Sequence, residues 1–330
     1  MTNKIRWGIM STGNIANQFA SDLPLASGAE LLAVGSRNEE TALTFAARHN
    51  IPRYYGSYEA LVEDADLDVI YIGTPNSEHL ANALLCLDAG KPVLLEKTFT
   101  INAEEAALLI ERARERKLFM MEAMWTRFLP VMVQVRRLLD EGVIGDLRQL
   151  SVDFGIWRPF NPEHRIFNPE LGGGALLDVG VYPISFASWV FGGPPAQFES
   201  SVHFGQTGVD EQFSLLFSYE GGRMAAISAG VNAATQRQAT IAGTDGMIKV
   251  LPMWNKSNTL VLQLRGQDEQ RIETPFEGVG YQFEADEVMR CLRAGKLESE
   301  IMPLDETLSI MRTLDEIRAQ WDMTFPMERV

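Results

Sequence analysis

The first 123 residues alternate short apolar runs with longer amphipathic segments. The apolar runs, which predict strands, are IRWGIM (5–10), ELLAVGS (30–36), PRYYG (52–56), LDVIYIGT (67–74) and PVLLEK (92–97). The segments between them, which predict helices, are 13–23, 38–50, 57–64, 76–90 and 102–117. Strands that alternate with helices across short links predict a parallel, doubly wound sheet of the Rossmann type. Ligands of such sheets lie at the carboxyl ends of the strands.

The pattern changes after residue 123, and we predict a domain boundary there. Segment 127–142 has a helical pattern, and from residue 146 onward apolar strand-like runs follow one another directly. They are DLRQLSVDFGIW, FESSVHFG, EQFSLLFSYEG, GRMAAISAGV, QATIAGTDGMIKVL and TLVLQLRG. YEGGR is a hairpin signal, and further helices are predicted at 175–191 and 304–322. The chain is therefore expected to form a Rossmann domain (1–123) and an α+β domain (124–330) with an open, mostly antiparallel sheet.

Composition and charge narrow the class of protein. The 330 residues are 46% hydrophobic and 22% charged, with a formal net charge of -15. This is typical of a globular protein, and the negative charge argues against nucleic acid as a partner. Cys86 and Cys291 lie in apolar stretches without further ligands at metal spacing, so we interpret them as buried thiols and expect no metal site. Neither a signal peptide nor an apolar run of about 18 residues is evident, so we expect a cytoplasmic protein without membrane contact.

The loop after the first strand is the candidate cofactor loop. In GIMSTGNIA (8–16) the dinucleotide fingerprint G-x-G-x-x-G/A falls on Ser11, Gly13 and Ala16, so serine replaces the first glycine. Backbone N–H groups at the start of the following helix can hold a pyrophosphate. The alternative is a plain strand-to-helix turn. We assign cofactor binding to the loop residues Ser11, Thr12, Gly13, Asn14 and Ile15.

The end of the second strand indicates which cofactor is bound. Enzymes that use NAD place a carboxylate there, but this chain has Ser36, Arg37 and Asn38. A hydroxyl and a guanidinium suit a ribose 2′-phosphate, so NADP(H) is favoured over NAD(H). In the alternative interpretation Arg37 is a solvated side chain and Asn38 caps the next helix.

Two further strand ends carry candidate cofactor residues. GTPNSEH follows the fourth strand and supplies Thr74, Pro75, Asn76 and His79, although a structural role for His79 is at least as well supported by the sequence. Glu96 and Lys97 end the fifth strand. Lys97 therefore lies at the ligand edge of the sheet, where an ammonium can bond a substrate oxygen.

Together these motifs resemble the Gfo/Idh/MocA family of nicotinamide-dependent oxidoreductases over essentially the whole chain. The resemblance rests on motifs in the family's order and spacing: GIMSTGNIA, GTPNSEH, LLEKTF, WTRFLP, FGIWRP, GGGALLDVGVYP and IAGTDGMIKV. One departure is Thr98, where the family has proline after the glutamate and lysine. MEAMWTRFLP, Tyr182 and the closing MPLDETLSIMRTLDEIRAQW resemble one subgroup, which carries tyrosine where many members carry histidine.

The resemblance implies roles for individual residues. It makes Lys97, Asp178 and Tyr182 catalytic, and it places Trp157 and Arg158 beside the cofactor, with Trp125 and Arg127 as further candidates. The expected substrate residues are Trp125, Phe154, Asp178 and Tyr182. Phe154 and Phe160 could form an apolar wall against a ring, or they could be ordinary core residues.

Tyr182 carries the chemistry that the resemblance implies. A hydride leaves a carbinol carbon only if the hydroxyl proton also leaves, and Tyr182 in its phenolate form can accept that proton as a general base. A free phenol has a pKa near about 10, so a cation such as Lys97 is needed to activate it. Asp178 would orient the substrate or the lysine. The alternative makes Tyr182 a buried core tyrosine and the glycines 172–174 a flexible loop.

The expected activity is NADP-dependent hydride transfer at a secondary alcohol or carbonyl of a sugar, sugar derivative or trans-dihydrodiol. Two alternatives stay open: a non-catalytic dinucleotide-binding sensor on the same fold, and an enzyme that holds NAD tightly for a net non-redox reaction. The family resemblance and the open second sheet lead us to expect a homodimer or homotetramer.

Overall fold

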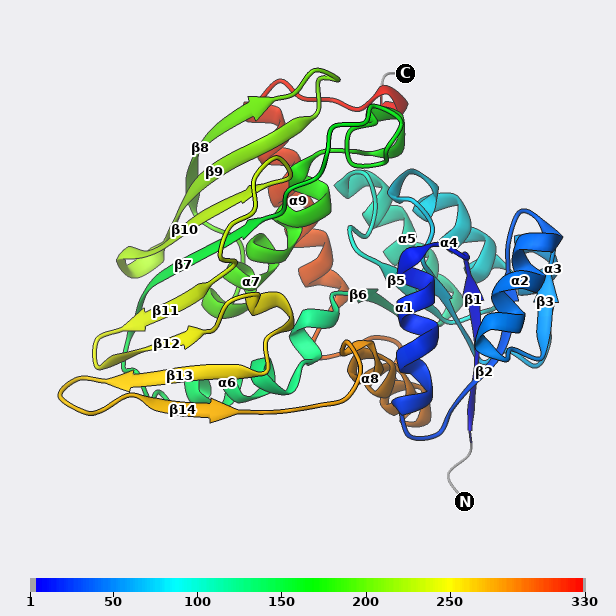
Figure 1. Ribbon diagram of the computed structural model, residues 1–330, viewed down its shortest axis with the longest axis horizontal. Coiled ribbons are helices and arrows are strands. Elements are labelled where there is room, and N and C mark those ends of the chain that lie inside the picture. The colour runs from blue at the N-terminus through cyan, green and yellow to red at the C-terminus, as the bar shows by residue number, and fades with distance from the viewer. Residues whose placement is uncertain (1–3, 329–330) are drawn as a thin grey trace. The chain divides into compact units, whose positions relative to one another are not determined.

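The computed structural model describes residues 4–328, which pack as two compact units (Figure 1). The first unit comprises Met1–Phe128 and Glu277–Leu308, and the second comprises Leu129–Phe276 and Ser309–Val330. These packing units differ from the two domains predicted from the sequence. The first unit ends five residues after the predicted boundary at residue 123, and it also contains Glu277–Leu308. The domain boundary itself remains a prediction.

The first unit is built on a six-stranded sheet in the order β3-β2-β1-β4-β5-β6, with every neighbouring pair parallel. Its strands are β1 (Ile5–Met10), β2 (Ala29–Gly35), β3 (Arg53–Tyr55), β4 (Val69–Ile72), β5 (Val93–Glu96) and β6 (Met120–Ala123). This strand order is that of a dinucleotide-binding Rossmann sheet, which confirms the predicted fold class. All four residues of β4 and all four of β5 are buried, because helices cover both faces of a parallel sheet.

The helices of the first unit begin and end where local chemistry predicts. They are α1 (Asn14–Asp22), α2 (Glu39–His49), α3 (Tyr58–Val62), α4 (His79–Asp88), α5 (Ala103–Arg116) and α8 (Tyr281–Arg293), with short 3₁₀ turns η1 (Leu23–Leu25), η2 (Asn76–Glu78) and η3 (Trp125–Phe128). Asn38, Ser57 and Asn102 each accept a backbone N–H of the helix that they precede. Helix α8 was not separately predicted, although it contains the apolar stretch around Cys291.

The second unit is built on an eight-stranded sheet in the order β14-β13-β12-β11-β7-β10-β9-β8. Its strands are β7 (Leu147–Gly155), β8 (Gln197–Phe204), β9 (Asp210–Tyr219), β10 (Arg223–Gly230), β11 (Ala239–Gly243), β12 (Gly246–Val250), β13 (Thr259–Leu264) and β14 (Gln270–Glu273). All pairs are antiparallel except β7 with β10, which confirms the mostly antiparallel prediction. The predicted run 238–251 is in fact two strands joined by a turn, and β14 was not predicted.

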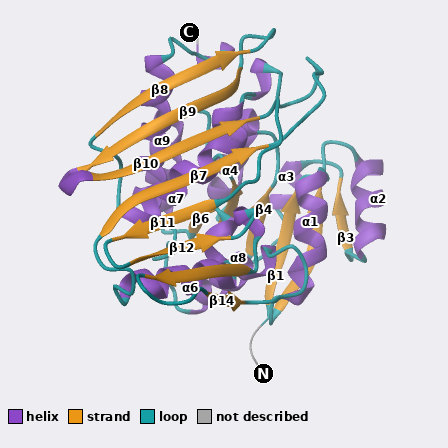
Figure 2. Ribbon diagram, turned by 60° about the vertical axis from the view of Figure 1, so that its left-hand side comes forward, coloured by secondary structure: helices purple, strands orange, loops and turns teal. Residues whose placement is uncertain are grey.

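Helices α6 (Pro130–Asp140) and α7 (Val181–Phe191) belong to this unit, together with the later part of α9 (Leu304–Gln320). Its short helical segments are η4 (Pro169–Leu171), η5 (Leu176–Gly180), η6 (Glu220–Gly222), η7 (Trp254–Lys256) and η8 (Pro326–Glu328). In Figure 2 the strands of the sheet lie in front of α6, α7 and α9. Burial alternates along the middle of β9, from Phe213 to Phe217, as expected for a sheet with one packed face.

The helical segment Pro169–Phe191 is long and apolar enough to cross a membrane by composition. Its most apolar window is 94% buried within the protein. We therefore interpret it as a core helix, which is the commoner origin of such a segment. No apolar run of about 18 residues was expected from the sequence, and this segment corrects that expectation.

Candidate functional site

In the loop after β1, Ser11 occupies the first glycine position of the fingerprint and adopts a backbone conformation that is typical of glycine. Ser11 has a φ of 143°, in the region that favours glycine. Its hydroxyl oxygen accepts a hydrogen bond from the N–H of Gly13 at 3.1 Å. Serine thus keeps the tight turn that the fingerprint requires and stabilises it with a side-chain bond that glycine lacks.

The start of α1 is open to an anion. Gly13 occupies the N-cap position and makes no side-chain hydrogen bond to the helix. The first N–H groups of a helix have no partner within the helix and carry the positive end of its dipole. An open hollow of about 530 Å³ adjoins the loop, lined by Thr12 and by the helix α2 residues Glu40, Thr41, Thr44, Phe45 and Arg48. These features fit the diphosphate and adenosine portion of a dinucleotide.

The three predicted cofactor residues after β2, Ser36, Arg37 and Asn38, differ in their exposure and in their contacts. Ser36 is buried, and its N–H bonds the carbonyl of Tyr55 at 3.0 Å. Arg37 is exposed. The side chain of Asn38 accepts the N–H of Thr41 at 3.0 Å, so the capping role proposed as an alternative for Asn38 is confirmed. Arg37 is the cation at this strand end that can reach a ligand.

The turn after β4 is fixed from within the protein. Thr74 is buried and accepts a bond from the Asn82 amide, whereas Pro75 is exposed and Asn76 begins η2. His79 is fully buried, with Nε2 3.0 Å from the carbonyl oxygen of Thr74 and Nδ1 2.9 Å from that of Thr98. Burial lowers the pKa of His79 to about 4. Its ring ties the turns after β4 and β5 together, and both of its nitrogens meet protein atoms rather than a ligand.

The end of β5 carries a buried polar cluster beside the candidate lysine. The Tyr71 hydroxyl donates to Glu96 Oε1 at 2.7 Å, and the Lys97 N–H donates to Glu96 Oε2 at 3.2 Å. Glu96 is 4% exposed and Lys97 is half-buried; the peptide between Lys97 and Thr98 is cis. Burial and the neighbouring Glu96 raise the pKa of the fully buried Glu284 well above its ordinary value. Glu96 thus anchors the backbone from which Lys97 projects, and sequence patterns gave no signal for Tyr71 or Glu284.

The WTRF segment forms the turn η3. Trp125 is 4% exposed and its ring packs 4.8 Å from that of Tyr281. Arg127 makes a two-pronged ion pair with Glu306, with both N–O distances at 2.8 Å. The suggestion that Arg127 lies beside the cofactor is therefore not supported, since its guanidinium is 4% exposed and engaged inside the unit.

In the second unit, the predicted single helix 175–191 is two kinds of helix. Leu176–Gly180 form a π-helical turn, η5, and α7 follows directly from Val181. A π turn closes hydrogen bonds over five residues instead of four, and such turns are frequent at functional sites. Asp178 lies within the π turn and Tyr182 within α7, so the two residues are not four positions apart on one regular α-helix.

The start of η5 is held by a buried carboxyl group that the sequence did not reveal. Asp210 on β9 is fully buried and accepts the N–H of Leu176 at 2.6 Å. Gly174 has a φ of +122°, and a Cβ placed there would lie 2.1 Å from Asp210 Oδ1. Burial raises the pKa of Asp210 to about 8. Because Gly174 has no side chain, the Asp210 carboxyl group can approach the start of η5. No local sequence pattern predicts that a residue of β9 makes this contact.

Asp178 and Tyr182 are both mostly buried, with 7% and 8% of their surfaces exposed. Arg165 Nη1 donates to Asp178 Oδ1 at 2.8 Å, so a residue of the loop HRIFNPELGGG neutralises this acid. The ring of Tyr182 lies 5.1 Å from that of Phe154. Phe154 in turn contacts Trp254, with ring centroids 6.3 Å apart. Phe154 and Trp254 thus form an aromatic cluster beside Tyr182, and both are buried, with 5% and 1% of their surfaces exposed.

The remaining predicted residues of this unit lie at its surface. Trp157 is 62% exposed and pairs with Asn232 through a single β-bridge, and Arg158 is also exposed. Phe160 is 44% exposed and packs its edge on Phe167, 5.3 Å away, rather than on Phe154. Within residues 4–328, no group of three or more His, Cys, Asp or Glu side chains could hold a metal ion.

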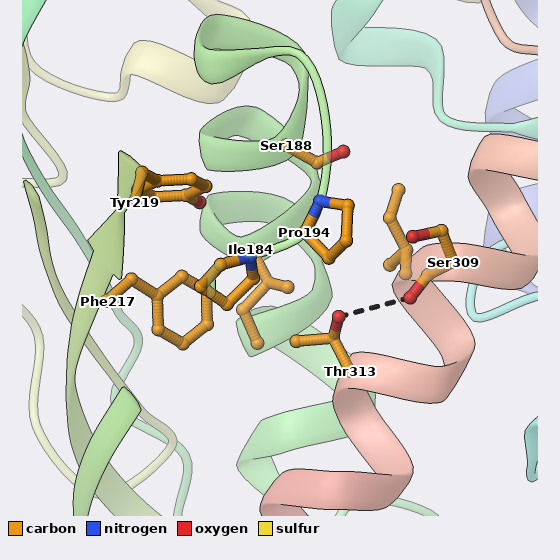
Figure 3. A pocket seen from close by; sticks show the side chains of 9 residues that line it. Ile184, Ser188, Pro194, Phe217, Tyr219, Ser309 and Thr313 are labelled. Carbon is orange, nitrogen blue, oxygen red and sulfur yellow. Dashed lines mark hydrogen bonds between the residues drawn. The ribbon is translucent and has the colours of Figure 1, made fainter. Parts of the chain in front are cut away.

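A separate small cavity lies at the other end of α7, between that helix, α9 and β9 (Figure 3). Its volume is about 10 Å³, and it is lined by Ile184, Ser188, Pro194, Pro195, Phe217, Tyr219, Ser309, Ile310 and Thr313. The Thr313 hydroxyl donates to the carbonyl oxygen of Ser309 at 3.1 Å. This volume has room for about one water molecule and is far below the roughly 300 Å³ of the smallest ordinary ligand pockets. It is a packing defect of the core and does not compete with the Tyr182 region as a substrate site.

Each unit thus assembles its own set of candidate residues. The first brings together the loop after β1, Arg37, the turn after β4 and Lys97. The second places Tyr182 against Phe154 and Asp178 against Arg165, and leaves Trp157 and Arg158 exposed after β7. Arg165, Asp210 and Trp254, which contact Asp178, η5 and Phe154, were not predicted as site residues.

Comparisons with known proteins agree with this division. Residues 5–124 match the model of an oxidoreductase family with an NAD-binding Rossmann fold, and residues 132–249 match the GFO/IDH/MocA C-terminal domain. The chain is 38% identical to a trans-1,2-dihydrobenzene-1,2-diol dehydrogenase of Xenopus tropicalis, over 97% of this chain and 99% of the relative. It is 37% identical to the enzyme of that name from Homo sapiens, over 98% and 99%.

Solved structures give the same result. A 3-ketoreductase from Actinomadura kijaniata, solved in complex with NADP and TDP-benzene, superimposes with a TM-score of 0.84 at 27% identity, over 96% of this chain and 98% of that one. The sequence resembles the subgroup of dimeric dihydrodiol dehydrogenase, also described as NADP-dependent D-xylose dehydrogenase. The names of the curated relatives agree with the dihydrodiol dehydrogenase part of this resemblance. The chain is an oxidoreductase of the Gfo/Idh/MocA family, with an N-terminal NAD(P)-binding Rossmann domain.

Proposed function

We propose that this protein is an NADP-dependent dehydrogenase or reductase. It would act on a secondary alcohol or the corresponding carbonyl of a small polyhydroxylated ring, such as an aldose, a sugar derivative or a trans-dihydrodiol. The observation that carries the proposal is Tyr182, a mostly buried phenol that packs against Phe154 at the start of α7, directly after the π-helical turn, in a chain that belongs to an oxidoreductase family. The names of the full-length relatives support the dihydrodiol among these substrates.

The nicotinamide, when bound, supplies the hydride chemistry, and the protein supplies position and proton transfer. The loop from Ser11 to Ile15 and the open start of α1 would hold the diphosphate. Tyr182 accepts the hydroxyl proton during oxidation and returns it during reduction. Lys97 donates to the substrate oxygen from its place directly after β5. Asp178, already paired with Arg165, orients substrate hydroxyl groups.

The decisive test is a spectrophotometric assay at 340 nm with a panel of aldoses and trans-diols, run with NADP⁺ and with NAD⁺. We expect turnover of at least one polyol or diol, faster with NADP⁺. Lys97→Met should lower turnover by orders of magnitude while NADPH still binds. Binding of the cofactor without turnover of any alcohol would favour the alternative function, a dinucleotide-binding sensor. Turnover that proceeds without net change of tightly held cofactor would favour a non-redox reaction.

The preference for NADP rests on Arg37, which is exposed at the end of β2 where no acid accompanies it. Arg37→Ala should weaken NADP(H) binding about 10- to 100-fold, as expected for loss of a charge-assisted bond to phosphate, and should affect NAD(H) binding far less. Fluorescence titration with both cofactors measures this. Arg112→Ala on the outer helix α5 is the control, and an equal loss for both cofactors would remove Arg37 from the 2′-phosphate site.

We also propose self-association through the eight-stranded sheet. Leu216 on β9 and Met224 on β10 are apolar, and their exposed fractions are 40% and 39%. An open antiparallel sheet that presents such residues is stabilised by covering that face. Light scattering should give the mass of a homodimer or homotetramer, and Leu216→Glu should shift it toward the monomer. A monomeric wild-type protein would reject the proposal.

A further inference from the structure

The loop that joins β10 to β11 brings an arginine to the aromatic cluster beside Tyr182. The Cζ atom of Arg237 lies 5.6 Å from the centroid of the Phe154 ring, and the Phe154 ring lies 5.1 Å from that of Tyr182. One aromatic ring therefore links the guanidinium to the proposed acid–base residue. No local sequence pattern distinguishes Arg237 from a surface arginine.

The backbone of Arg237 is fixed in an unusual conformation. Its φ is +52°, a left-handed value that residues with a side chain adopt at a cost of about 1 kcal/mol or more. The N–H of Arg237 donates to Asp153 Oδ2 at 2.8 Å, and its carbonyl oxygen accepts the N–H of Trp254 at 2.9 Å. The neighbouring Gln238 N–H donates to Asp153 Oδ1 at 2.9 Å. The side chain thus projects from a rigid point.

The guanidinium itself has no polar partner among the described residues. Arg237 is half-buried, and partial burial lowers its pKa, an effect that the nearby Asp153 opposes. The Asp153 carboxylate is occupied by backbone N–H groups and by the Thr235 hydroxyl. By contrast, Arg136 and Arg223, which also stack on aromatic rings, each donate hydrogen bonds to carbonyl oxygens.

A second arginine belongs to the segment beside this loop. Arg158 adjoins its start, since the Arg158 N–H bonds the carbonyl of Val231 at 2.9 Å. Asp178, the acid nearest to Tyr182 in the chain, is already neutralised by Arg165. Arg158 and Arg237 thus belong to adjoining segments of a chain whose formal net charge is -15. An unpaired, partly desolvated guanidinium on a rigid backbone is suited to bind a carboxylate or phosphate with two parallel hydrogen bonds.

We propose that Arg237 binds an anionic oxygen group of the substrate, so that the preferred substrates are polyols that carry a carboxylate or a phosphate. This inference rests on the proposed function, since it concerns the substrate of the same site. No new bond is made or broken by Arg237; its role is to fix the charged end of the substrate while the carbinol end reacts at Tyr182.

The test compares matched substrates in Arg237→Met and in the wild-type protein. The probes are D-galactose, D-galacturonate and D-galactose 6-phosphate, each with NADP⁺. For the wild-type protein, kcat/KM should be higher for at least one of the two anions than for the neutral sugar. The ratio of anionic to neutral kcat/KM should fall about 10- to 100-fold in Arg237→Met, as expected for loss of a charge-assisted bond. The carboxylate and phosphate arms show which anion is bound.

Arg223→Met is the matched control, because Arg223 also stacks 5.6 Å from a ring centroid, that of Phe191, away from Tyr182. It should leave the ratio as in the wild-type protein. An Arg237→Met variant with an unchanged ratio, or a wild-type protein that prefers the neutral sugar, would overturn the proposal.

A calorimetric titration of the two anions into the NADPH-bound protein separates this proposal from the proposed function. The anion site is supported if the wild-type protein binds D-galacturonate or D-galactose 6-phosphate and Arg237→Met does not. This holds even if no alcohol is turned over. Turnover of neutral alcohols, with anion binding that is equal in both proteins, would refute the anion site and leave the oxidoreductase function standing. Circular dichroism of the variant confirms that it is folded.

Discussion

In the six-stranded unit the candidate residues lie at the carboxyl ends of parallel strands. Most of them are expected to bind the cofactor through backbone N–H groups. Ser11 forms a turn, α1 presents free N–H groups, and Lys97 follows β5 directly. In the eight-stranded unit the candidate residues come from one helical turn and from the side chains packed on it. Asp210 holds the start of η5, Arg165 pairs with Asp178, and Phe154 supports Tyr182.

The difference has a physical reason. A parallel sheet fixes where all its strands end, so any ligand edge can be located once the strand order is known. An antiparallel sheet has no such common edge, and its site depends on long-range contacts of individual side chains. We therefore expect substitutions in the second unit to have large, position-specific effects, and substitutions in the cofactor loop to have graded ones.

The largest expected effect is on the proposed proton transfer in the second unit. Tyr182→Phe should lower kcat by about 10²- to 10⁴-fold, because the phenol is the proposed general acid–base group, while NADPH binding is retained. Steady-state assay and cofactor titration measure the two quantities. Tyr219→Phe is the matched control, since the Tyr219 hydroxyl is buried on β9 without a hydrogen-bond partner. Similar losses in both variants would assign the effect to packing rather than to chemistry.

The contact between the glycine run and Asp210 can be broken next. Gly174→Ala should destabilise the protein by about 2–4 kcal/mol, because the added methyl group would meet the buried Asp210 carboxyl at a positive φ. Urea unfolding measures the free energy. Gly192→Ala is the control, since Gly192 also has a positive φ, +83°, but has no atom within 4 Å of its added methyl group. It should cost about 1 kcal/mol, and equal costs at both positions would contradict the packing argument.

Buried acids in the two units should make stability depend on pH. The pKa of Asp210 is raised to about 8, so between about pH 4 and 8 the unfolded chain loses this proton while the folded chain keeps it. Unfolding then releases a proton, and the free energy of unfolding falls as the pH rises. Asp210→Asn should remove this part of the decline, which we expect to be about 1–3 kcal/mol.

Urea unfolding at pH 5 and pH 8 gives the measurement. Glu122→Gln is the counterpart in the first unit, where burial raises the pKa of Glu122 to about 7. The part of the pH-dependent fall in unfolding free energy that is due to Glu122 should therefore end near pH 7. A pH dependence that is the same in Asp210→Asn and in the wild-type protein would mean that Asp210 is ionised in the folded state.

The smallest expected effect tests the cofactor loop. Ser11→Gly removes a positive φ of 143° from a residue with a side chain, but it also removes the bond from the Gly13 N–H. The two changes nearly cancel, so we expect a net stabilisation of at most about 1 kcal/mol. Thermal unfolding and NADPH titration measure the result. A marked loss of stability would show that the hydroxyl bond, and not the turn conformation, is what the loop requires.

Periodicity was sufficient to predict the first unit well. Segment 5–10 is β1 without change, and Asn38 and Ser57 cap the helices that they precede. It was less informative in the second unit, where β11 and β12 were predicted as one strand and β14 was missed. When two short antiparallel strands are joined by a tight turn, their hydrophobic pattern continues through the turn, so the sequence pattern alone predicts a single strand.

The sequence by itself determined the Rossmann sheet, its ligand edge, the family, and the identity of Lys97, Asp178 and Tyr182 as candidates, because these depend on local periodicity and on short motifs. Only the tertiary structure decided that His79 and Arg127 are engaged inside the protein, that Asp178 and Tyr182 are joined through a π-helical turn, and that Asp210 and Arg237 lie against that turn and its aromatic cluster. These contacts join residues that are far apart in the chain, and no local pattern encodes them.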